Sequence, residues 1–210
     1  MDIKLNNWRK KLKNKKDYRI ATYGACFSAD NLKKNIWVLE LQKDLNFANC
    51  DAKIFVKGMG GKNSNWGVAN LKNRVISLNP DLVILEFAGT DSKNKNGVSI
   101  EKSINNIKVI CDTLISKNID IIMLSTLPNI LKGRDKSIRR YFAEHKEIAA
   151  AKNIEFIDLC RVFDKMEKED PKKFALSLTN DRGHLTKYGA VKVVKPIMKS
   201  FFLGENSYDE

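Results

Sequence analysis

Five short apolar stretches recur along the chain, and longer segments with a helical repeat of apolar residues separate them. Strands buried on both faces of a sheet are continuously apolar, whereas amphipathic helices place apolar residues every three to four positions. The apolar stretches predict strands at 18–23, 52–56, 82–87, 119–125 and 154–159. The helical repeat predicts helices at about 31–46, 65–78, 99–117, 135–152 and 186–203.

The last predicted helix carries two positional signals. Thr186 stands where an N-cap is expected, and Pro196 lies inside the helix, where its missing N–H predicts a kink or a break. Strands that alternate with helices are typical of an α/β protein with a parallel sheet and right-handed crossovers. In such sheets the ligand site lies beyond the carboxyl ends of the strands. The residues that directly follow each strand are therefore the ones to examine.

The composition fits one soluble globular domain. The chain has 210 residues, of which 43% are hydrophobic and 30% charged, enough to form a complete core. We expect a basic N-terminal arm at 1–17, one domain at 18–203 and a C-terminal tail at 204–210. No apolar run approaches the roughly 18 residues of a membrane helix, and the N-terminus has no secretory h-region. We therefore expect no membrane span and a cytoplasmic location.

The net charge of +13 leaves two interpretations open. A strongly basic protein can bind nucleic acid, an anionic glycan or a membrane surface. Here, however, the lysines are spread over many predicted helix faces and form no stripe with interleaved aromatic residues, which favours a purely compositional origin. Residues 1–20 hold eight Lys or Arg against two Asp, so we expect a solvated or partly disordered arm. We expect no specific nucleic-acid partner.

Small, polar and glycine residues gather directly after the predicted strands. "GACFS" follows the first strand, "KGMGGKNS" the second, "AGTDS" the third and "TLPN" the fourth, while "DRGHLTKYG" precedes the last helix. One edge of the sheet thus collects a thiol, an Asp-x-x-His pair and several glycines. A nucleophile, a base, an orienting carboxylate and oxyanion donors are what acyl transfer requires.

Only two histidines could act as the base. His145 lies in "RRYFAEHKEIAAAKN", a predicted helix with many polar residues, and we expect it at the surface. His184 lies in a turn, with Asp181 three residues before it. The four cysteines are far apart and form no CxxC pair, which argues against a zinc site. We expect Cys50, Cys111 and Cys160 in the core, and no metal or other cofactor.

The order of these blocks resembles the SGNH (GDSL-type) hydrolase family over about residues 18–202. "YGACFS" is similar to the first block, with Cys26 at the position of the nucleophilic serine, and "GGKNS" to the second, with Gly61 as an oxyanion donor. "EFAGTD" is similar to the third block, and Asp181 with His184 to the last. The resemblance implies a flavodoxin-like three-layer α/β/α fold with a five-stranded parallel sheet in the order 2-1-3-4-5.

Two positions depart from the family pattern. Cys26 replaces the serine, and Thr90 replaces the asparagine of the oxyanion hole. The resemblance implies that Cys26 and Gly61 supply the other two oxyanion donors. A thiol beside an imidazole and a helix N-terminus can form a thiolate. Loss of one oxyanion donor costs roughly 10²–10³ in rate. Ser28 is the rival nucleophile, but it stands at the position whose side chain supports the turn in the family. Asp91 is expected to support the loop after the third strand through hydrogen bonds to the backbone.

We expect, on this resemblance, an acyl-ester hydrolase that acts on a small-molecule or carbohydrate O-acyl ester. Cys26 attacks, His184 is base and then acid, and Asp181 orients His184. Two alternatives remain: an acyltransferase that passes through a Cys26 acyl-enzyme, and a degenerate member that binds an ester without turnover. A dinucleotide-binding module fits less well, because "GMGG" is not GxGxxG after a first strand. The oligomeric state does not follow from the sequence.

Overall fold

The computed structural model describes residues 7–29, 36–127, 135–180 and 183–204. They build a parallel five-stranded sheet in the order β2-β1-β3-β4-β5, as predicted. The strands are β1 (Tyr18–Gly24), β2 (Ala52–Val56), β3 (Leu82–Glu86), β4 (Asp120–Leu124) and β5 (Glu155–Ile157). The helices are α1 (Asn7–Asn14), α2 (Ile36–Phe47), α3 (Ser64–Arg74), α4 (Ala88–Asp91), α5 (Ile100–Ile115), α6 (Asp135–Ala151), α7 (Leu159–Glu169), α8 (Pro171–Ser177), α9 (Lys187–Gly189) and α10 (Lys195–Leu203).

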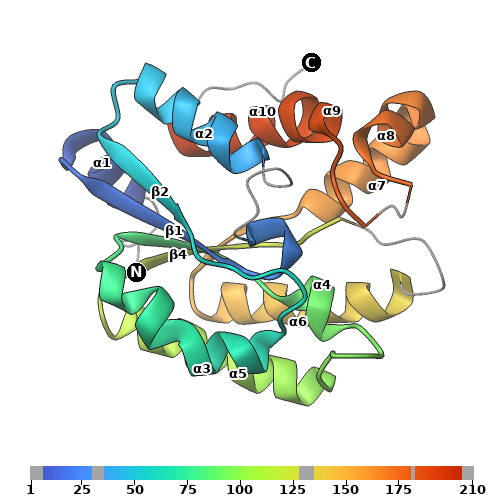
Figure 1. Cartoon of the computed structure of the whole chain (residues 1–210), viewed down its shortest axis with the longest axis horizontal. Helices are drawn as coiled ribbons and strands as arrows, with labels where there is room; N and C mark the ends of the chain where they lie inside the picture. Colours follow the sequence, from blue (N-terminus) through green and yellow to red (C-terminus); the bar gives the residue numbers. More distant parts are fainter. Residues whose placement is uncertain (1–6, 30–35, 128–134, 181–182, 205–210) are drawn as a thin grey trace.

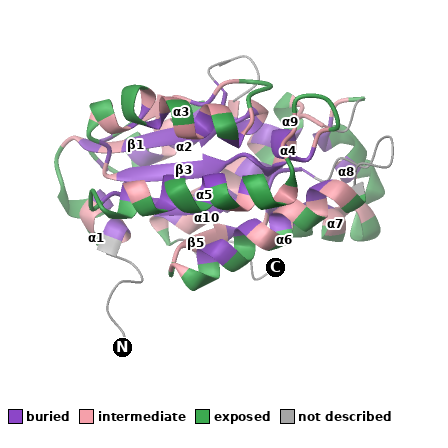
Figure 2. Cartoon of the chain, turned by 90° about the horizontal axis from the view of Figure 1, so that it is seen from below, coloured by how far each residue is buried: buried purple, intermediate pink, exposed green. Residues whose placement is uncertain are grey.

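Helices cover both faces of the sheet, which gives the three-layer α/β/α arrangement (Figure 1). α2, α7 and α10 lie on one face, and α3, α5 and α6 on the other. Seen along the layers, the strands are buried and the outer sides of the helices are exposed (Figure 2). None of the helices in the described ranges combines the length and the apolarity that a bilayer crossing demands.

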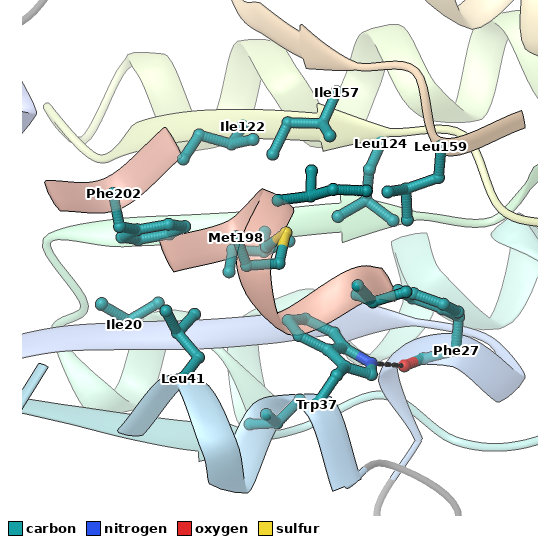
Figure 3. Close-up of a cluster of buried hydrophobic side chains, with 14 of the residues drawn as sticks. Ile20, Phe27, Trp37, Leu41, Ile122, Leu124, Ile157, Leu159, Met198 and Phe202 are labelled. Atoms are coloured by element: carbon teal, nitrogen blue, oxygen red, sulfur yellow. Dashed lines mark hydrogen bonds between the residues drawn. The ribbon is translucent and has the colours of Figure 1, made fainter. Parts of the chain in front are cut away.

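Each central strand contributes to two separate cores because its side chains alternate between the faces of the sheet. In β3, Leu82 and Ile84 join the core under α2 and α10, while Val83 and Leu85 join the core under α3 and α5. The first of these cores is shown in Figure 3. Fully burying one such side chain contributes about 1.5–3 kcal/mol. The continuous apolar pattern that predicted the strands is thus the sum of two alternating faces.

The basic N-terminal segment is not a solvated arm over its described part. Residues 7–14 form α1, in which Trp8 is 4% and Leu12 0% exposed. The Trp8 ring lies 5.1 Å from that of Phe202 and stacks on Phe201 at 5.7 Å. Trp8 and Leu12 are four residues apart and share one face of the helix. The many lysines obscured this short apolar face in the sequence.

The last predicted helix is interrupted, as its proline predicted. α9 is followed by a π-helical segment (Ala190–Val194), and α10 then begins with Pro196 in its first turn. A proline has no N–H to donate to the preceding turn, and the π-helical turn accommodates the missing hydrogen bond. The N-cap prediction for Thr186 is confirmed, because its side chain accepts the Gly189 N–H at 3.1 Å.

Candidate active site

Cys26 lies directly after β1, at the start of a 3-10 helix formed by Cys26–Ser28. It is partly exposed, whereas Phe27 and Ser28 are buried. The Phe27 carbonyl accepts a hydrogen bond from Trp37 Nε1 at 3.1 Å, and the two rings stack at 5.1 Å (Figure 3). Trp37 is 0% exposed. The residue next to the thiol is therefore anchored in the core, so the thiol has a fixed support at the sheet edge.

The thiol of Cys26 has a lowered pKa of about 7. The largest cause is a hydrogen bond between its side chain and that of His184; the Gly61 N–H and the charges of Lys93 and His184 act in the same direction. Burial opposes them by raising the pKa. A thiolate is the nucleophilic form of cysteine. The Cys26 thiol therefore ionises closer to neutral pH than an ordinary cysteine does.

A short turn positions His184 opposite the thiol. The His184 carbonyl accepts hydrogen bonds from the Thr179 N–H at 3.0 Å and from Thr179 Oγ1 at 3.1 Å. Leu178 and Leu185 form an antiparallel bridge, which closes the turn at the end of α8. These contacts hold the backbone of His184 at the end of α8. Asp181, the predicted orienting carboxylate, lies outside the described residues.

The loop after β2 brings Gly61 to the same place. Gly61 has a φ of 76°, a left-handed conformation in which residues with a side chain are strained. The Met59 N–H donates to the Gly24 carbonyl at 3.0 Å, which ties this loop to the end of β1. The structure thus brings Cys26, His184 and Gly61 together, although the residues come from three distant parts of the sequence.

Thr90, the other predicted oxyanion donor, lies in α4 after β3. Its N–H donates to the Phe87 carbonyl at 3.0 Å, and the residue is 1% exposed. Its assignment to an oxyanion hole stays a prediction. Ser28, the rival nucleophile, is 0% exposed, and its N–H donates to Glu86 Oε1 at 3.1 Å. Burial therefore favours the partly exposed Cys26 over Ser28 as the group that reaches a substrate.

A buried carboxyl, Glu86, lies beneath the Cys26 turn and was not predicted. It is 3% exposed, and its pKa is raised well above the usual range, first by burial and then by the charge of Cys26. The Ser28 N–H opposes this rise. Burial thus favours the protonated form of Glu86. Its sequence signal was an acidic residue inside the otherwise apolar stretch "LVILEF".

Asp91 supports the loops through a buried polar network. Its Oδ1 accepts the Ser64 N–H at 2.7 Å at the start of α3, and its Oδ2 accepts Ser103 Oγ at 2.5 Å. Ser103 Oγ also lies 2.9 Å from His145 Nε2. Burial raises the pKa of Asp91. The network joins α3, α4, α5 and α6, and through Ser64 it holds the helix that follows the Gly61 loop.

The expectation that His145 lies at the surface was wrong. The residue is 5% exposed, and burial lowers its pKa to about 4, so it is neutral at physiological pH. The sequence did contain a signal. Ile138, Phe142, His145 and Ala149 fall at helical spacing, and all four are buried on the inner face of α6. His145 is thus part of the scaffold rather than the second candidate base.

We expect Ser103→Ala to lower the free energy of unfolding by about 1–3 kcal/mol, because it leaves Asp91 and His145 without a shared buried partner. Urea unfolding would measure the loss. Ser116→Ala is the matched control: it removes a hydroxyl from the exposed end of the same helix, where Ser116 Oγ donates to the Thr113 carbonyl. Equal stability of the two variants would contradict a structural role for the network.

Comparison with known proteins gives matches to solved structures only. No family model matches the sequence, and no curated protein matches it. The structure matches a lipase/acylhydrolase from Enterococcus faecalis with a TM-score of 0.76 at 17% identity, covering 89% of this chain and 96% of that one.

Two acetylxylan esterases match equally well. One, AlAXEase, has a TM-score of 0.75 at 20% identity, over 89% of this chain and 99% of that one. The other, from Geobacillus stearothermophilus, has a TM-score of 0.77 at 16% identity, over 92% of this chain and 96% of that one. Identities this low establish the fold alone. The chain has the three-layer α/β/α fold of the SGNH/GDSL-type hydrolases.

Proposed function

We propose that the chain is an acyl-ester hydrolase in which Cys26 is the nucleophile. The observation that carries the proposal is the proximity of the His184 side chain and the Gly61 N–H to the Cys26 thiol, where both lower its pKa, to about 7. In this proposal Cys26 is the nucleophile, His184 the base and the Gly61 N–H an oxyanion donor. That is the minimum set for acyl transfer.

The names of the structural neighbours support the same chemistry. They are a lipase/acylhydrolase and acetylxylan esterases. In the Geobacillus stearothermophilus esterase, catalytic mutants replace a serine, an aspartate and a histidine, and the last two have the same three-residue spacing as Asp181 and His184. These neighbours make a small or carbohydrate O-acyl ester the first substrate class to test.

The proposed reaction has two halves, and it begins when the Cys26 thiol passes its proton to His184. The Cys26 thiolate attacks the ester carbonyl, and the N–H groups of Gly61 and Cys26, with Thr90 in support, stabilise the oxyanion. When the C–O bond breaks, protonated His184 gives its proton to the departing alcohol, which leaves a thioester on Cys26. Neutral His184 then takes a proton from water as the water attacks the thioester. Carboxylic acid departs and the thiolate is restored. Asp181 is proposed to orient His184.

Acyl transfer is the second candidate, and the identity of the nucleophile favours it. A thioester is more reactive toward amines and thiols than an oxygen ester, so a Cys26 acyl-enzyme could pass its acyl group to an acceptor other than water. The same residues serve both reactions. The two functions differ only in what attacks the thioester.

Intact-protein mass spectrometry during reaction with p-nitrophenyl acetate would test the proposal. We expect wild type to gain one acetyl group that Cys26→Ala does not gain and that forms more slowly in His184→Ala. Decay of the adduct in water indicates a hydrolase; decay only after addition of a sugar or an amine indicates a transferase. Equal acetylation of Cys26→Ala, or neither adduct nor turnover with a panel of acyl esters, would overturn the proposed enzyme and leave a binding protein.

A further inference from the structure

Lys93 lies on the loop that follows α4, at the same edge of the sheet as the candidate nucleophile. β1 and β3 are paired with Gly24 opposite Glu86, so both chains leave the sheet at the same level. The Lys93 N–H donates to the Thr90 carbonyl at 3.0 Å, which continues the α4 turn. Lys93 is half-buried, whereas 94–96 are exposed. The loop therefore holds this side chain against the protein instead of releasing it into solvent.

The positive charge of Lys93 influences the candidate site, and no carboxylate of the described residues forms an ion pair with it. Its charge is one of the causes that lower the pKa of Cys26. Other lysines of the chain do have partners: Lys11 pairs with Asp120 at 2.7 Å, and Lys195 with Glu40 at 3.3 Å. A half-buried cation beside a nucleophile, without a carboxylate partner, has its charge available for a ligand.

The loops around Cys26 also carry positive charge. Within the described chain, 57–63, 92–99 and 183–189 contain five lysines and no aspartate or glutamate: Lys57, Lys62, Lys93, Lys95 and Lys187. Two carboxyls at the end of β3 and in α4, Glu86 and Asp91, are buried and have raised pKa values. This edge of the sheet therefore presents a positive potential to an approaching substrate.

We propose that Lys93 binds an anionic group of the substrate, so that the enzyme selects an O-acyl ester that carries a carboxylate or a phosphate close to the ester bond. The inference rests on the proposed function and narrows its substrate class. A charge-assisted contact from a partly buried ammonium favours the anionic over the neutral substrate by roughly ten- to a hundredfold. Neutral acetylated sugars would then be weak substrates.

Alkylation of Cys26 tests the anion site without any ester. Iodoacetate and iodoacetamide attack the same sulfur and differ in one carboxylate, so the ratio of their rates reports the local charge. We expect Lys93→Gln to lower the iodoacetate-to-iodoacetamide ratio about tenfold. Lys108→Gln, which removes an exposed lysine from α5, is the charge-matched control and should leave the ratio unchanged. Both reagents are compared at one pH of about 8.5, so the thiolate fraction of each variant cancels in the ratio.

Ester kinetics in the same variants identify the anion. The probes are para-acetoxybenzoate, para-acetoxyphenyl phosphate and the neutral methyl para-acetoxybenzoate, each compared through kcat/KM in wild type and Lys93→Gln. We expect the preference for one anionic probe to fall about tenfold in Lys93→Gln and to weaken with added salt.

The outcomes separate the two proposals. An unchanged alkylation ratio in Lys93→Gln overturns the anion site even if neutral esters are hydrolysed. Turnover of all three esters without a Lys93-dependent preference also overturns it and leaves the proposed hydrolase intact. A Lys93-dependent alkylation ratio without turnover of any ester supports the anion site while it refutes the hydrolase.

Discussion

Replacing His184 with alanine is expected to move the midpoint of Cys26 alkylation from about pH 7 toward the ordinary thiol value of 9.0. The hydrogen bond to His184 is the largest cause of the lowered pKa, and burial, which raises the pKa, remains in the variant. The thiolate fraction at pH 7 would fall from about one half to about 1%. The more basic thiolate is a better nucleophile, so the alkylation rate at pH 7 falls only about tenfold.

Ester turnover should lose more than alkylation, because His184 also transfers protons. General acid–base catalysis contributes roughly 10²–10⁴ in rate. The rate of Cys26 alkylation by iodoacetamide, measured between about pH 5 and 10, gives the midpoint directly. Tyr188→Phe is the control for disturbance of the turn, because Tyr188 is exposed and lies four residues after His184. A midpoint that stays near 7 without His184 would assign the low pKa to Gly61 and Lys93 instead.

Gly24→Ala is expected to cause the largest loss of stability of any single change considered for this chain. A Cβ at position 24 would lie 1.9 Å from the Glu86 carbonyl oxygen and 2.7 Å from its carboxyl carbon. The obstacle is backbone, so the paired ends of β1 and β3 must separate. We expect a loss of about 3 kcal/mol or more, which lowers Tm by about 6–12 °C for a domain of this size.

Gly60→Ala provides the comparison, because the nearest atoms to its added Cβ are at 3.8 and 3.9 Å. This variant should unfold within about 0.5 kcal/mol of wild type. Thermal unfolding followed by circular dichroism would measure both changes. If Gly24→Ala has the same Tm as wild type, the close approach of Glu86 to the end of β1 is unnecessary for the fold.

The sheet was predictable because a central parallel strand needs apolar residues on both faces, a demand visible in stretches such as "LVILEF". Besides α1 and the short α4, the helices α7 and α8 were missed. Their apolar positions, among them Phe163, Met166 and Phe174, are diluted by lysines and acidic residues, although Asp170 before Pro171 is an N-cap followed by a first-turn proline. The strands were more visible because their burial is two-sided.

The candidate site was only partly predictable. Residues that follow parallel strands meet at one edge of the sheet, and the resemblance to the SGNH blocks selected Cys26, Gly61 and His184 among them. Glu86, Lys93 and the Ser103–His145 contact depend on where side chains point after packing, which a single sequence does not state. The surface expectation for His145 failed because the many polar residues around it concealed a buried helix face.

The docking of α1 on α10 has a consequence for how the chain folds as it is made. Trp8 stacks on Phe201, and Arg9 Nε donates to the Phe201 carbonyl at 3.0 Å across 192 positions of sequence. Arg9 also binds the Glu155 carboxylate at 2.7 and 2.9 Å. A chain on the ribosome that still lacks α10 cannot bury Trp8 in this way, because the aromatic partners follow it by more than 190 residues. α1 is thus made well before the helix on which it docks, and its docking must wait until the rest of the sheet and α10 have been synthesised.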